Sequence, residues 1–174
     1  DLHRVDRRQR QMCIRDRPKA VSVIEMGQGE LYYNKVVKPT IHSYMGQVFE
    51  DMCKYYTLKQ GIIGSFDCFV TTVGSWWGTE TVITDNGEKV VQSADIDVVA
   101  LSELEKKAVI GECKFKNEKV DKAIYDTLLR RIKVIPAKYK VVKLILFSLS
   151  GFTDWFDTFS DEKLELIALK DIYH

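Results

Sequence analysis

The chain has few cysteines and no long apolar run. No apolar stretch approaches the roughly 20 residues that span a bilayer, and no charged-then-apolar leader resembles a signal peptide. The four cysteines form no Cys-x-x-Cys pair and have no neighbouring histidine cluster, which argues against a disulfide framework or a structural zinc site. We therefore expect a protein of the reducing cytoplasm that does not enter a membrane.

Arginine is almost absent after residue 17. Six of the arginines precede Pro18, and only Arg130 and Arg131 follow it. Residues 1–17 hold six of the 26 cations and three of the 25 acids, so the remainder carries a net charge of −2. This balance argues against a globally basic nucleic-acid binder of the simplest kind.

The arginine-rich segment 1–17 has two interpretations. It is either a basic arm for nucleic acid or a non-native addition, because its string QMCIRDR resembles a translated sequencing adapter of the kind found in proteins assembled from environmental DNA. We favour the second interpretation and leave the segment out of the fold prediction. It implies that the natural amino-terminal part of the protein is missing.

The hydrophobic pattern predicts one α/β domain over residues 41–174, preceded by a connecting segment over 18–40. Apolar residues recur at helical spacing over 41–59 and again after Asn117, which we expect to cap the second helix. β-Branched and apolar runs predict the strands, and a short helix is expected around Trp155; the strand segments are 69–77, a hairpin over 81–92, 94–101, 108–115, 141–147 and 164–169. This order predicts a mixed central sheet flanked by helices.

Charged residues interrupt two of the apolar strands. Asp97 lies in one, and Glu112-Cys113-Lys114 ends the next. Since the connection between them is too short for a crossover, the strands are expected to be antiparallel neighbours, with Glu112 and Lys114 on one face and Asp97 within reach. The alternative is an interstrand salt bridge on a solvated sheet face, and Asp95 is expected to lie at the strand entry or the rim.

Two converging carboxylates raise each other's pKa unless a counter-charge is present. Mg²⁺ or Mn²⁺ would supply that charge, with Asp97, Glu112 and the backbone carbonyl of Cys113 as oxygen ligands. Lys114 would then orient a water molecule or offset charge on a phosphate. These are the requirements of metal-dependent phosphodiester hydrolysis.

These residues resemble the PD-(D/E)xK nuclease signature, in the strings DIDVVA and GECKF. Four motifs together resemble one family over roughly residues 30–174, the nuclease-like domain of unknown function at the carboxy end of archaeal and bacterial AAA+ type ATPases; they are YMGQVFE (44–50), GSWWG (74–78), GECKF (111–115) and LFSLSGF (146–152). The resemblance implies a restriction-endonuclease-like αβββαβ core. It also implies an ATPase domain upstream in the intact protein. This chain itself has no P-loop motif, so we do not expect it to bind ATP in that manner.

The resemblance assigns a role to each matching position. It makes Asp97 and Glu112 the metal-binding acids and Lys114 the catalytic lysine. It makes Glu50 an additional acid that contacts the metal through water, although helical spacing also allows a solvated flank position. The proline that sometimes opens the signature is replaced by Ile96.

Further side chains near the motif are candidate contacts to nucleic acid. Lys116, Lys119, Lys122 and Arg130 are predicted to meet phosphates, or else to form a solvated helix face. Trp76 and Trp77 are adjacent, so one ring is expected in the core. We therefore expect a Mg²⁺-dependent nuclease that acts on DNA, with a homodimer as a candidate assembly. The alternative is an inactive nuclease-like module that binds nucleic acid or regulates the parent ATPase.

Overall fold

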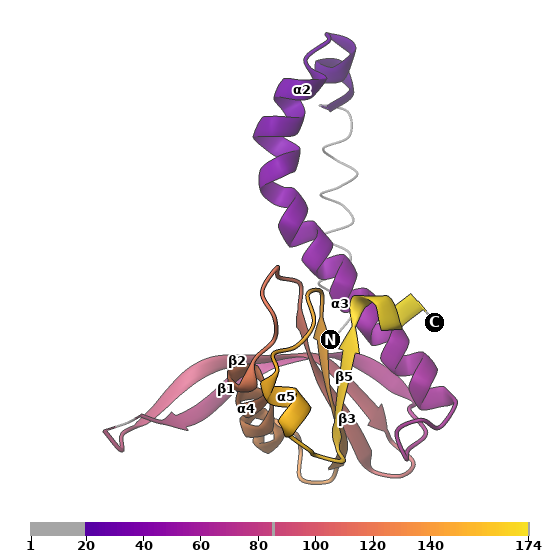
Figure 1. The fold of residues 1–174 in the computed structure, drawn as a ribbon, viewed down its shortest axis with the longest axis vertical. Helices are drawn as coiled ribbons and strands as arrows, with labels where there is room; N and C mark the ends of the chain where they lie inside the picture. Colours follow the sequence, from indigo (N-terminus) through magenta and orange to yellow (C-terminus); the bar gives the residue numbers. More distant parts are fainter. Residues whose placement is uncertain (1–19, 85, 174) are drawn as a thin grey trace. The chain divides into compact units, whose positions relative to one another are not determined.

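The structure is a computed structural model that describes residues 20–84 and 86–173. The chain divides into two compact units, residues 1–45 and residues 46–174 (Figure 1). The segment 1–17 lies outside the described residues, so both interpretations of it stay predictions. No helix in the described part of the chain is long and apolar enough to cross a membrane.

The described part of the first unit is helical. Residues 20–25 form a helix that ends near Gly27, whose φ of 77° is one that glycine adopts readily. After it come α2 (Gly29–Tyr32), a π-helical turn η1 (Tyr33–Val37) and the start of α3 (Lys38–Ile62). Neither α2 nor η1 has a buried residue, in line with a segment outside the core. The predicted start of the helix at residue 41 was three residues late.

A five-stranded mixed sheet forms the centre of the second unit. Its strands follow one another in space as in sequence; they are β1 (Thr72–Ile83), β2 (Lys89–Ser102), β3 (Lys107–Lys114), β4 (Lys140–Ser148) and β5 (Leu164–Ala168). The strands β1, β2 and β3 pair antiparallel, whereas β4 runs parallel to both β3 and β5. The predicted α/β class with a mixed sheet is confirmed, and the sheet is consistent with a restriction-endonuclease-like core.

Helices cover both faces of this sheet. Phe49 and Cys53 of α3 pack on one face, in a cluster with Val98, Val109 and other buried residues. The other face packs against α4 (Lys122–Arg131), through Tyr125 and Leu128, and α5 (Trp155–Thr158), through Phe156. Two short 3₁₀ turns follow α4 and β5, η2 (Ile132–Val134) and η3 (Leu169–Tyr173).

Two details of the prediction were wrong. The cap of α4 is Asp121, whose carboxylate accepts hydrogen bonds from the N–H groups of Ala123 and Ile124, rather than Asn117. The predicted hairpin is also not separate from its neighbours: its first strand continues the strand predicted over 69–77 as β1, and its second continues into the strand predicted over 94–101 as β2. The two pair along 11 registered positions of β1 from Thr72 to Ile83. The expectation for the tryptophans holds, since Trp76 packs against the core while Trp77 is 63% exposed.

A β-bulge interrupts β2 at Asp97. Gly74 pairs with Val99 but Trp76 pairs with Ile96, so β2 carries one extra residue between these pairs. As a result Ile96 joins the cluster under α4, whereas Val98, two positions later, joins the cluster under α3. The bulge therefore exchanges the faces to which the side chains of β2 point, at the position of Asp97.

Candidate functional site

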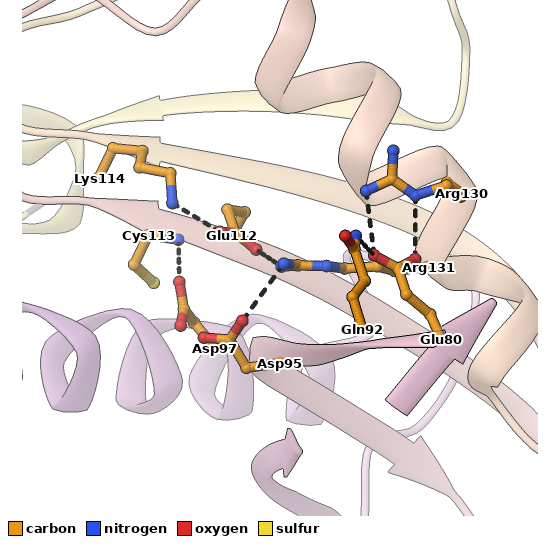
Figure 2. A network of polar contacts seen from close by, with 9 residues as sticks. All are labelled: Glu80, Gln92, Asp95, Asp97, Glu112, Cys113, Lys114, Arg130 and Arg131. Atoms are coloured by element: carbon orange, nitrogen blue, oxygen red, sulfur yellow. Dashed lines mark hydrogen bonds and ion pairs between the residues drawn. The ribbon is translucent and has the colours of Figure 1, made fainter. Parts of the chain in front are cut away.

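The two motif strands separate at Asp97 and Glu112. The ladder between β2 and β3 ends at the pair of Val98 with Gly111, and Asp97 and Glu112 are the next residues on each strand. The Cys113 N–H donates a hydrogen bond of 2.8 Å to Oδ2 of Asp97 across the gap. We call the residues Asp95–Asp97 of β2 and Glu112–Lys114 of β3 the strand fork (Figure 2).

Glu112 is paired with two cations at once. Its side chain is only 7% exposed, and Nζ of Lys114 lies 2.6 Å from its Oε1. The guanidinium of Arg131, from α4, donates from Nη1 to Oε2 of Glu112 at 3.0 Å and lies 3.2 Å from Asp95 through Nη2. Figure 2 shows Arg131 reaching between the two acids. The predicted joint projection of Glu112 and Lys114 is thus present, with Arg131 as a member that was not predicted.

Burial governs the acidity of the fork. Burial raises the pKa of Asp97, although the hydrogen bond from Cys113 opposes the shift. Burial also raises the pKa of Glu112, and the nearby charge of Asp97 adds to it. The pKa of Lys114 is raised as well, since its burial, which would lower it, is outweighed by Glu112. The two carboxyls therefore hold protons more strongly than ordinary acids unless a cation offsets them.

Glu50 lies near the same site, on α3. Burial, followed by the charge of Asp97, raises the pKa of Glu50, which shows that its carboxyl senses the fork. Its side chain is 39% exposed and its Oε2 lies 3.9 Å from Nζ of Lys54. The role of Glu50 as an additional acid of the site stays a prediction.

The donor atoms of the fork fit a hard divalent cation. Asp97 and Glu112 offer carboxylate oxygens. The backbone carbonyl of Cys113 points to the fork, because successive carbonyls of a strand point to opposite sides and the next one, of Lys114, accepts a hydrogen bond from the Leu149 N–H on the other side of β3. No three His, Cys, Asp or Glu side chains of the described residues gather as a metal-binding group. A metal here would therefore rest on two carboxylates and a backbone carbonyl, with Glu50 reaching it through water.

The thiol of Cys113 points away from this chemistry. It lies in the core cluster beneath α3, beside Cys53. Burial, together with a hydrogen bond between the two thiols, raises the pKa of the Cys113 thiol well above its usual range. This thiol is a core group, and only the backbone of Cys113 serves the fork.

The predicted nucleic-acid contacts fall into two groups. Lys116, Lys119 and Lys122 are exposed beyond the end of β3, with Lys119 3.7 Å from Asp154. Arg130 instead forms a two-pronged ion pair with Glu80 of β1, at 2.9 and 3.0 Å. All three lysines are exposed, with Lys122 paired to Asp126, whereas the guanidinium of Arg130 is committed to Glu80.

Arg131 and Glu80 are the residues that sequence reasoning missed. Glu80 is 6% exposed and also accepts a hydrogen bond from Gln92. Arg130 and Arg131 are the only arginines after residue 17, and that scarcity was the available signal. Adjacent positions on a helix point about 100° apart, so the two side chains diverge to different acids.

One family model matches this chain, over residues 18–124. The matched segment contains Glu50, Asp97, Glu112 and Lys114, and it ends within α4 before Arg131. No curated protein and no solved structure is similar enough to give a match. The chain belongs to the DUF234 family, described as archaeal and bacterial proteins of unknown function.

Proposed function

We propose that the sheet domain hydrolyses phosphodiester bonds of DNA at the strand fork, in the manner of a PD-(D/E)xK nuclease. The observation that carries this proposal is the meeting of Asp97, Glu112 and Lys114 where β2 and β3 separate. Burying two acids costs free energy of folding unless cations offset their charge. Acids with perturbed pKa values cluster at functional sites, which favours a functional role for this set. Their chemistry matches what cleavage of a phosphodiester requires.

Asp97, Glu112 and the carbonyl of Cys113 would hold a Mg²⁺ or Mn²⁺ ion, with Glu50 as a ligand through water. When bound, such an ion polarises a phosphoryl oxygen and lowers the pKa of coordinated water. The carboxylates must be ionised to act as ligands, although burial raises the pKa of both. Protons therefore compete with the metal for these oxygens, and uptake of the metal should weaken as pH falls.

Lys114 acts as a charge rather than as a base. Its pKa is raised, so its ammonium group stays protonated at neutral pH. With a side chain 25% exposed, it lies between buried Glu112 and solvent, within reach of a phosphate at the mouth of the fork. A donor held there stabilises negative charge that builds up on the phosphate during attack.

The exposed lysines extend this surface. Lys116, Lys119 and Lys122 follow the site strand and would contact the phosphates of a bound duplex. Binding would then weaken as salt rises, because each contact releases counterions from DNA. An upstream AAA+ type ATPase domain and a homodimeric arrangement are part of the same proposal, motivated by the four sequence motifs.

Cleavage of plasmid and linear DNA with Mg²⁺ or Mn²⁺ tests this function. We expect Glu112→Gln and Lys114→Ala each to lower the rate about 100-fold or more. Asp157→Asn makes the same carboxyl-to-amide change at an exposed position of α5, and this variant should cleave like the wild type. Equal, chelator-insensitive cleavage in all four proteins would overturn the catalytic proposal.

One observation favours an inactive module instead. Both oxygens of Glu112 are already paired, with Lys114 and Arg131, so this acid is neutralised without a metal. Such a domain would bind nucleic acid or regulate its ATPase without chemistry. Calorimetric titration with Mn²⁺ separates the two functions, because a nuclease site takes up the ion and a self-neutralised scaffold does not.

A further inference from the structure

Arg131 pairs with an acid that a metal at the fork would also use. Its guanidinium joins Glu112 of β3 to Asp95 of β2, at 3.0 and 3.2 Å. Its side chain is 12% exposed, whereas that of Asp95 is 67% exposed. One end of this bridge is therefore buried and the other lies in water.

The bridge is not fully satisfied. Nε of Arg131 is one of two buried side-chain polar atoms without a hydrogen-bond partner among the described residues. A buried donor left unpaired costs about 1–3 kcal/mol, which offsets part of what the ion pairs contribute. The arrangement therefore neutralises Glu112 at a cost that release of the side chain would recover.

A divalent cation and Arg131 compete for the same carboxylate. With Oε1 taken by Lys114, Oε2 is the oxygen that Arg131 must yield or share when Glu112 becomes a ligand. The two cations also repel each other, since both would lie beside one buried acid. Removing the charge of Arg131 would end both the competition for Oε2 and the repulsion, and so would strengthen binding of the metal.

We propose that Arg131 is an internal counter-cation that occupies Glu112 until a divalent metal displaces it, so that this arginine sets the metal affinity of the fork. The inference rests on the metal site of the proposed function. Arg131 is a positioning residue here, because it acts through Glu112. α4 stays in place during the exchange, since Leu128 is fully buried and Arg130 is tied to Glu80.

Calorimetric titration with Mn²⁺ compares the wild type, Arg131→Gln, Arg131→Lys and the control Lys133→Gln. A unit charge a few ångströms from a divalent ion changes affinity about tenfold or more even when water screens it. We expect Arg131→Gln to bind Mn²⁺ at least tenfold more tightly. Arg131→Lys, which keeps the charge, should stay near the wild type. Lys133→Gln removes the same charge from an exposed position just after α4 and leaves the fork intact, so its affinity should be unchanged.

Thermal unfolding gives a second readout that needs no catalysis. In chelator, Arg131→Gln should unfold at a lower temperature than the wild type, and saturating Mn²⁺ should raise that temperature more than it does for the wild type. Uptake by the wild type with equal or weaker affinity in Arg131→Gln overturns this inference and leaves the proposed function standing. Absence of Mn²⁺ binding in every protein overturns both.

Discussion

The carboxylate of Asp97 accepts a hydrogen bond of 2.8 Å from the backbone N–H of Cys113. This bond links the two halves of the motif directly, from a side chain of β2 to the main chain of β3. It favours the ionised form of Asp97, yet burial is the larger effect and the pKa of Asp97 remains raised. Ionised Asp97 therefore lowers the stability of the folded state, and other residues must offset that free energy.

That cost predicts how stability depends on pH in the absence of metal. A carboxyl with a raised pKa binds protons more strongly in the folded state, so stability is greatest below its ordinary pKa and falls as pH rises through the raised pKa. Asp97→Asn should flatten this decline and be more stable than the wild type at neutral pH. Urea unfolding from pH 4 to 8 in chelator measures it, and identical pH profiles would contradict the prediction.

The ion pair of Glu80 with Arg130 has the opposite dependence on pH. The hydrogen bond from Arg130 lowers the pKa of Glu80, so its contribution is present above the ordinary carboxyl pKa and is lost as pH falls through the lowered pKa. Arg130→Ala leaves Glu80 buried with Gln92 as its remaining partner and should cost about 2 kcal/mol at pH 7. Lys133→Ala, an exposed neighbour, should change stability by less than about 0.5 kcal/mol. Equal unfolding midpoints for the two variants would count against a structural role for this pair.

Two glycines of α3 should respond in opposite directions to alanine. A Cβ at Gly61 would lie 2.2 Å from Cγ2 of Val70, while a Cβ at Gly46 meets nothing within 4 Å. Gly61→Ala should destabilise the domain by about 2 kcal/mol through overpacking. Gly46→Ala should stabilise it by about 0.5–1 kcal/mol, because alanine favours the helix. Chemical denaturation compares them, and a shift of the same sign in both would refute the packing argument.

The adjacent tryptophans predict different optical and energetic effects. Trp76 packs under α4, whereas Trp77 is 63% exposed on the other face of β1. Trp76→Ala should cost about 3 kcal/mol, and Trp77→Ala less than about 1 kcal/mol. Trp77→Phe should move the fluorescence emission to shorter wavelength by removing the solvated indole. If Trp77→Phe leaves the spectrum unchanged, the assignment of faces is wrong.

The prediction from sequence succeeded where the pattern was local. The runs around Asp97 and Glu112 are long and β-branched, and their four-residue connection leaves an antiparallel pair as the simple solution. It did not include the bulge, because one extra residue in β2 becomes visible only through the partners of Gly74 and Trp76.

The remaining part of the fork arises from tertiary packing. Arg130 and Arg131 have the same chemistry and adjoin in sequence, so periodicity alone does not indicate that one reaches Glu80 and the other Glu112. Their targets depend on where α4 crosses the sheet. Asp121 as the cap of α4, four residues after the expected Asn117, sets that position.

The connectivity of the sheet has a consequence for the order of folding. Asp97 and Glu112 belong to one hairpin closed by a short turn, whereas Arg131 arrives through the longer parallel connection from β3 to β4. Local pairings form faster than crossovers, because they close smaller loops. We therefore expect the acids to meet before their arginine does. A hairpin that forms before α4 packs would carry the acids of the fork with Lys114 but without Arg131, and cations in the medium would speed its formation.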